Sequence, residues 1–129
     1  MKITTLIARY LLGLLFVVFG LNGFLHFIPT GPMPTGAAGQ FMAAVMVGSH
    51  YMTVVFAIQL VAGLLLLVGQ YVPLALTLLA PVIVNVVMFH AFMAPEGLPL
   101  AVITTVLWLI AAYPVRSVFA VLLRRNVTV

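Results

Sequence analysis

Residues 6–28, LIARYLLGLLFVVFGLNGFLHFI, decide the fold. The stretch is almost entirely apolar and is long enough to cross about 30 Å of hydrocarbon, which takes roughly 20 helical residues. The segment PTGPMP at 29–34 ends it, because proline and glycine interrupt helices. An unpaired backbone polar group is costly in lipid, so a spanning run must form a helix. The stretch therefore predicts a membrane-crossing helix.

Three further apolar runs follow, at residues 41–69, 73–93 and 98–123. Together with the first run they predict one all-α domain over residues 1–129, an integral membrane four-helix bundle. The second run is longer than one crossing needs. Counting back about 20 residues from Gly69 starts that crossing near residues 49–50. Residues 36–47 are therefore expected to extend outward or to lie in the membrane interface.

The composition supports lipid as the main solvent of this chain. Hydrophobic residues make up 66% of the sequence and charged residues 5%, against roughly 45–50% and about 25% in soluble domains. The chain has no cysteine, which excludes disulfides, thiol chemistry and iron–sulfur ligation by its own residues. A net charge of +4 is too small for a nucleic-acid surface, so no nucleic-acid partner is expected.

The charges also predict an orientation. The cations lie near the two chain ends, at Lys2, Arg9, Arg116, Arg124 and Arg125. Lysine and arginine are enriched in cytoplasmic flanks of membrane helices. Four crossings then place both the N-terminus and the C-terminus in the cytoplasm. Glu96, the only acidic residue, falls in an outer loop.

Polar residues within the apolar runs are the candidate site. His26, His50 and His90 fall in one layer near the outer boundary when each helix is measured at about 1.5 Å per residue. Asn22 and Asn85 lie about one turn deeper. Polar side chains are costly in hydrocarbon and often functional. We take Asn22, His26, Asn85 and His90 as the candidate ligand-binding residues.

Several interpretations of these residues stay open. Histidines can simply sit at the membrane interface, and Asn22, Asn85 and Gln59 can form interhelical hydrogen bonds. A metal site is disfavoured because no two histidines are four residues apart and the acidic residue is single. A b-type haem would need two facing histidines. A quinone headgroup needs only one or two hydrogen-bonding groups and apolar walls, which these residues and the neighbouring phenylalanines supply.

The predicted helix at residues 73–93 contains one proline in its interior. Pro81 has no N–H, so it leaves the carbonyl of Thr77 without its helical donor and predicts a kink. Asn85 is four residues further on the same face, and we expect its amide to reach the freed carbonyl.

Six stretches in order along the chain resemble the DoxX family: RYLLGLLF at 9–16, FGLNGF at 19–24, AGLLLLVG at 62–69, VPLA at 72–75, APVIVN at 80–85 and FHAFMAPEGL at 89–98. The resemblance covers nearly the whole chain. It implies a multi-pass protein of the inner (cytoplasmic) membrane with four helices. The family takes its name from a membrane subunit of a thiosulfate:quinone oxidoreductase, and relatives are linked to redox stress. Two departures stand out, since members often carry a glutamate where this chain has Gln59 and a basic residue where it has Gln70.

The resulting hypothesis is a small DoxX-like membrane subunit that works beside redox protein partners and contacts quinone in its outer half. The alternative is a non-catalytic scaffold or assembly factor for other membrane proteins. No residue offers a nucleophile or an acid–base pair, so catalytic residues are unknown and enzymatic activity stays open, as does the oligomeric state. No metal is expected, and quinone is the candidate cofactor.

Overall fold

The computed structural model describes residues 2–127, and all regular secondary structure in that range is helical. The elements are α1 (Lys2–Leu25), α2 (Gly36–Met42), η1 (Ala43–Val47), α3 (Tyr51–Val68), α4 (Val72–Phe92), η2 (Pro95–Gly97), α5 (Leu98–Ala112), η3 (Tyr113–Val115) and α6 (Arg116–Leu122). Four segments are long and apolar enough to cross a membrane: α1, α3, α4 and the continuous stretch Pro95–Leu122. The predicted all-α fold with four candidate spans is confirmed, and it indicates a multi-pass membrane protein.

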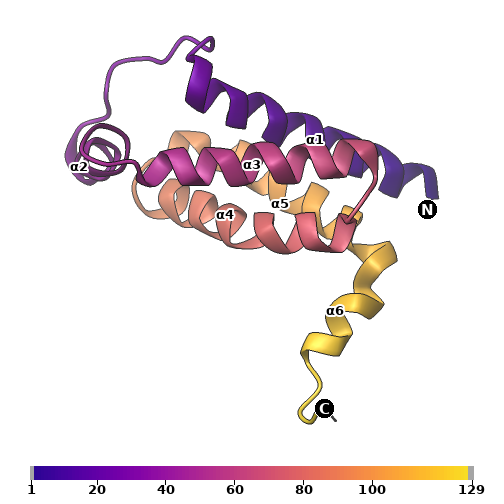
Figure 1. Ribbon diagram of the computed structural model, residues 1–129. Coiled ribbons are helices and arrows are strands. Elements are labelled where there is room, and N and C mark those ends of the chain that lie inside the picture. The colour runs from indigo at the N-terminus through magenta and orange to yellow at the C-terminus, as the bar shows by residue number, and fades with distance from the viewer. Residues whose placement is uncertain (1, 128–129) are drawn as a thin grey trace.

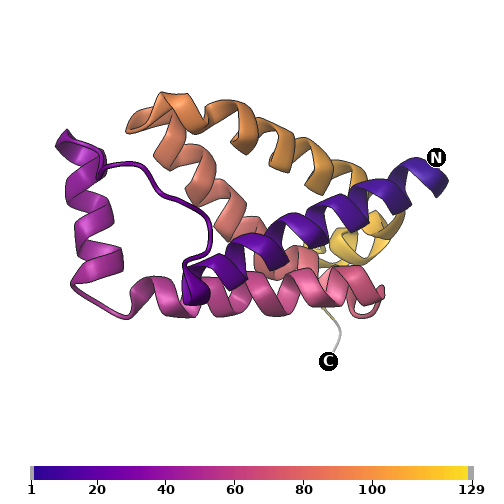
Figure 2. The same ribbon diagram turned by 90° about the horizontal axis from the view of Figure 1, so that it is seen from above.

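The long helices pack side by side as a bundle (Figure 1). The most extensive contact joins α1 to α3, and α5 also packs against α1, while α4 contacts both α3 and α5. The start of α1 and the end of α5 lie at one end of the bundle, which we call the terminal end (Figure 2). The α2–η1 segment lies at the opposite end, which we call the loop end.

Glycines allow α1 and α3 to touch backbone to backbone. A Cβ atom added to Gly20 would lie 2.8 Å from the Leu60 nitrogen, and one added to Gly63 would lie 2.8 Å from the Val17 nitrogen. Real side chains do not tolerate such distances, so any larger residue would force the helices apart. Small residues serve this purpose in membrane bundles, where close packing rather than water exclusion holds helices together.

The tightly packed core lies toward the terminal end. Its largest fully buried side chains come from three helices, with Leu12 on α1, Leu66 on α3, and Leu76 and Leu79 on α4. The Trp108 indole Nε1 of α5 donates a 2.9 Å hydrogen bond to the Leu76 carbonyl. This bond satisfies the indole N–H inside the bundle and ties the fourth span to the third.

The expected helical run 41–69 is divided into two helices. Helical structure is interrupted at residues 48–50, between η1 and α3. The Ser49 hydroxyl lies 3.2 Å from the Ala44 carbonyl at the end of one helix and accepts the Tyr51 N–H, at 3.3 Å, at the start of the next. One side chain thus serves both helix ends, as serine does at caps. The α2–η1 segment lies across the bundle axis rather than along it (Figure 1).

The fourth run also changes direction. Pro114 cannot donate to the helix ladder, and the chain passes from α5 through the 3-10 turn η3 into α6. Helix α6 points away from the bundle axis (Figure 1). The expected helix 98–123 is therefore a longer and a shorter helix joined at Pro114.

Helix α4 runs continuously through Pro81. The Asn85 amide Nδ2 donates to the carbonyl of Pro81 itself, at 2.8 Å, and not to the carbonyl of Thr77 that the proline frees. The predicted link between Asn85 and Pro81 is therefore present, but its acceptor is the Pro81 carbonyl and not the freed Thr77 carbonyl. The reason is local, since a side chain reaches the carbonyl four residues earlier without any distortion of the helix.

Candidate functional site

A cavity of about 410 Å³ lies in the half of the bundle toward the loop end. Every span contributes to its walls, and Met42 and Met46 of the α2–η1 segment close part of it. Four aromatic rings line it, from Phe16, Phe19, Phe56 and Phe89. Its polar lining residues are Asn22, Gln59, His90 and Thr104. A mostly apolar cavity with a few converging polar groups is the usual form of a small-molecule site.

Gln59 is the most informative of these residues. It lies in the middle of α3, and its side chain is only 6% exposed. Its amide makes no hydrogen bond within residues 2–127, although the sequence predicts an interhelical bond for it. Neither amide atom is wholly inaccessible, and the accessible space that Gln59 borders is the cavity. A buried amide is normally satisfied, so this one offers a donor and an acceptor to the cavity.

Thr104 is the second buried polar residue of the cavity wall, at 5% exposure on α5. Its hydroxyl donates to the Leu100 carbonyl at 2.8 Å. The donor is therefore used inside the helix, and the hydroxyl oxygen keeps lone pairs that can accept.

His90 reaches the cavity from the end of α4. Its Nδ1 lies 2.9 Å from the Ala94 carbonyl, which can only accept, so Nδ1 carries the proton. In the neutral ring Nε2 is then an acceptor. The ring packs against Gly97, where an added Cβ would overlap it, and makes an edge contact with Phe89 at 5.2 Å between centroids. Its orientation is thus fixed on three sides.

Asn22 joins the cavity wall to the end of α1. Its Oδ1 accepts the Ile28 N–H at 2.7 Å, which holds the chain close to the helix after it ends. The amide nitrogen makes no hydrogen bond within the described part of the chain. The Asn22 amide oxygen therefore holds the chain after α1, whereas the amide nitrogen remains available as a hydrogen-bond donor.

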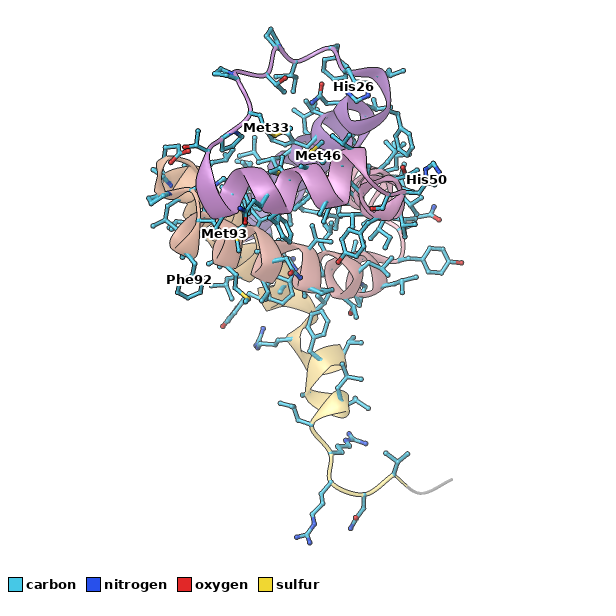
Figure 3. The ribbon with its side chains drawn as sticks, turned by 90° about the vertical axis from the view of Figure 1, so that its left-hand side faces the viewer. His26, Met33, Met46, His50, Phe92 and Met93 are labelled. Atoms are coloured by element: carbon cyan, nitrogen blue, oxygen red, sulfur yellow. The ribbon has the colours of Figure 1, made fainter. Side chains whose placement is uncertain are left out.

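His26 lies outside the cavity, because α1 ends at Leu25 and not at Ile28 as predicted. His26 adopts a left-handed backbone with φ of 51°, and its N–H still donates to the Asn22 carbonyl. Its side chain is exposed. His50 is exposed as well, and Figure 3 shows the two rings apart at the edge of the molecule.

The structure thus brings together Asn22 and His90 of the four predicted residues. Asn85 is exposed on the outside of α4, and neither Asn85 nor His26 lines the cavity. Within residues 2–127 no group of three or more histidine, aspartate or glutamate side chains is placed to hold a metal ion. The three histidines of the predicted layer do not converge, because His90 lines the cavity while His26 and His50 are exposed outside it.

Gln59 and Thr104 line the cavity, although neither is among the residues predicted for the site. A signal was available for Gln59, since it is an isolated amide in the middle of an apolar helix. Thr104 gave no such signal, because threonine often bonds to its own helix, as Thr104 and Thr105 both do here.

The cavity chemistry is that of neutral hydrogen bonding between aromatic walls. It contains no carboxylate, lysine, arginine or thiol among its lining residues. Such a site suits an uncharged, flat molecule that carries oxygen atoms at its edge.

Comparisons of the chain with protein-family models, with curated proteins and with solved structures gave no match. The resemblance to the DoxX family therefore stays a prediction, and function is inferred from the cavity itself.

Proposed function

We propose that this protein binds the headgroup of a membrane quinone in the loop-end cavity, as a small DoxX-like subunit that works beside redox protein partners. The observation that carries the proposal is the unpaired amide of Gln59, nine-tenths buried in a cavity with aromatic walls. A polar group in that state costs about 1–3 kcal/mol unless a ligand or water satisfies it.

The hydrogen-bonding groups match both oxidation states of a quinone. The carbonyls of the oxidised form accept hydrogen bonds, which the Gln59 and Asn22 amide nitrogens can donate. The hydroxyls of the reduced form donate, and Gln59 Oε1 and His90 Nε2 can accept. Such a site holds either form without a change of protonation in the protein. A bound quinone would supply the two-electron chemistry, and the side chains would bind and orient its headgroup.

The size and walls of the cavity support the same ligand. Small-molecule sites usually enclose roughly 300–1,000 Å³, and this one encloses about 410 Å³. Phe19 of α1 and Phe89 of α4 lie on its walls and can pack against a flat ring. The methionines of the α2–η1 segment add adaptable apolar contacts.

The proposal includes an orientation in the inner membrane, with both termini in the cytoplasm. It is supported by the start of α1 and the end of α5 lying at the same end of the bundle (Figure 2) and by the cations in the sequence near the two chain ends. Glu96 lies in η2, near the opposite end. The cavity would then face the outer half of the bilayer.

A matched pair of variants tests the proposal. Gln59→Leu removes the buried amide of the cavity, whereas Asn85→Leu removes an exposed amide elsewhere on the same bundle. Each protein is purified in mild detergent, and quinone in the lipid extract is measured per mole of protein. Wild type and Asn85→Leu should retain quinone, and Gln59→Leu should lose about tenfold in affinity. Absence of quinone from all three, even after its addition, would favour the scaffold hypothesis.

A further inference from the structure

A second cavity, of about 230 Å³, lies at the terminal end of the bundle. Lys2, Thr5 and Arg9 line one side of it, and these residues follow the three-to-four-residue spacing of a single face of α1. Its other walls are apolar and include Val72 at the start of α4 and Pro114 in η3. A cationic stripe therefore faces an apolar wall across a small space.

Arg9 lacks a hydrogen-bond acceptor in this cavity. Its guanidinium is partly buried, and its Nε is inaccessible and unpaired. No hydrogen bond from its other nitrogens exists within residues 2–127. Its contacts are the Tyr10 ring, 4.9 Å from Cζ, and the backbone of Gly69, where an added Cβ would lie 2.9 Å from Nη1.

The location of the Arg9 guanidinium beside Gly69 has an electrostatic reason. Gly69 caps the C-terminus of α3, where the partial negative charge of the helix attracts a cation. That attraction does not replace a hydrogen bond, because no Arg9 N–H donor reaches a carbonyl of residues 2–127. Buried charges in proteins are normally paired.

Residues 2–127 provide no counterion for Lys2 and Arg9. Glu96 is the only acidic side chain and belongs to η2 at the loop end, whereas Arg9 and Lys2 lie near the start of α1. Within the described part of the chain, no anion neutralises the Lys2–Arg9 pair.

We infer that this cavity binds the phosphate group of an anionic phospholipid. The planar guanidinium presents paired N–H donors that match phosphate oxygens, and Lys2 adds a second, more mobile cation. The apolar wall would take the glycerol and upper acyl carbons, which a free phosphate ion lacks. The site is independent of quinone binding, since it lies at the other end of the bundle.

The test measures lipid binding to the purified full-length protein by native mass spectrometry. The probes are phosphatidylglycerol, phosphatidylcholine and inorganic phosphate, each titrated separately. Wild type should bind phosphatidylglycerol most tightly. Arg9→Gln should weaken that binding about tenfold, since it removes charge-assisted hydrogen bonds. Arg124→Gln, a charge-matched change at an exposed position outside the cavity, should leave it unchanged.

A further variant controls for the case in which Arg9→Gln loses lipid binding because it misfolds. Lys2 is exposed, so Lys2→Gln cannot disturb packing, and it should weaken phosphatidylglycerol binding by a smaller factor than Arg9→Gln does. Equal losses at Arg9 and Arg124 would assign the effect to overall charge and overturn the inference. Equal binding of the two phospholipids would also overturn it. Inorganic phosphate binding as tightly as the lipid would reassign the cavity to a free anion.

Discussion

Replacement of Gln59 by leucine should stabilise the protein while it weakens ligand binding. Gln59 is 6% exposed, and its amide has no hydrogen bond to the described residues. Such a group costs about 1–3 kcal/mol relative to a satisfied one. The cavity, at about 410 Å³, is large enough to admit water that satisfies part of this need. We therefore expect the free energy of unfolding to rise by about 1 kcal/mol.

The assay is reversible unfolding in a denaturing detergent, followed by circular dichroism, with quinone removed. Asn85→Leu is the control, because it deletes an exposed amide that donates to the Pro81 carbonyl at 2.8 Å. Its stability should stay unchanged or fall slightly. A fall of about 1 kcal/mol or more in Gln59→Leu would show that the amide has a structural partner. The cavity would then lose its main hydrogen-bonding group.

Two further predictions concern the loop end and the membrane orientation. Gly97→Ala should displace the His90 ring and reduce quinone retention. Gly31→Ala is the control, because Gly31 has open space around it, and it should leave retention unchanged. Equal retention in both variants would contradict the role given to His90. The φ of Gly97 is −89°, so alanine adds no backbone strain and the effect is steric. A cysteine at Thr35 should react with an impermeant thiol reagent added to intact cells, and one at Val127 should not; the reverse pattern would invert the topology.

The sequence predicts the four spans well, because hydrocarbon thickness sets a minimum length that few other structures share. It also predicts that the second run cannot be one crossing, and the structure breaks it at residues 48–50. The length of a segment and the need for its backbone groups to form hydrogen bonds depend on that segment alone. Both can therefore be predicted without knowing how the helices pack together.

The direction in which each polar side chain points could not be predicted in the same way. Helix α4 is apolar on all sides, so its sequence does not distinguish the face toward lipid from the face toward the bundle. Asn85 was expected at the site and points outward. His26 does not line the cavity, because α1 ends three residues before the end of its apolar run. After the helix ends, the Asn22 side chain accepts a hydrogen bond from the Ile28 N–H. Both outcomes depend on tertiary packing and capping.

Photoaffinity mapping with a light-activated quinone would reveal whether quinone occupies the loop-end cavity. We expect the label to attach to peptides of α1, α3 and α4 that line the loop-end cavity, including the α3 peptide around Gln59. Excess natural quinone should abolish this labelling, and Gln59→Leu should reduce it strongly while Asn85→Leu does not. Labelling spread over the lipid-facing surface, unaffected by competitor or by Gln59→Leu, would contradict a quinone site in this cavity.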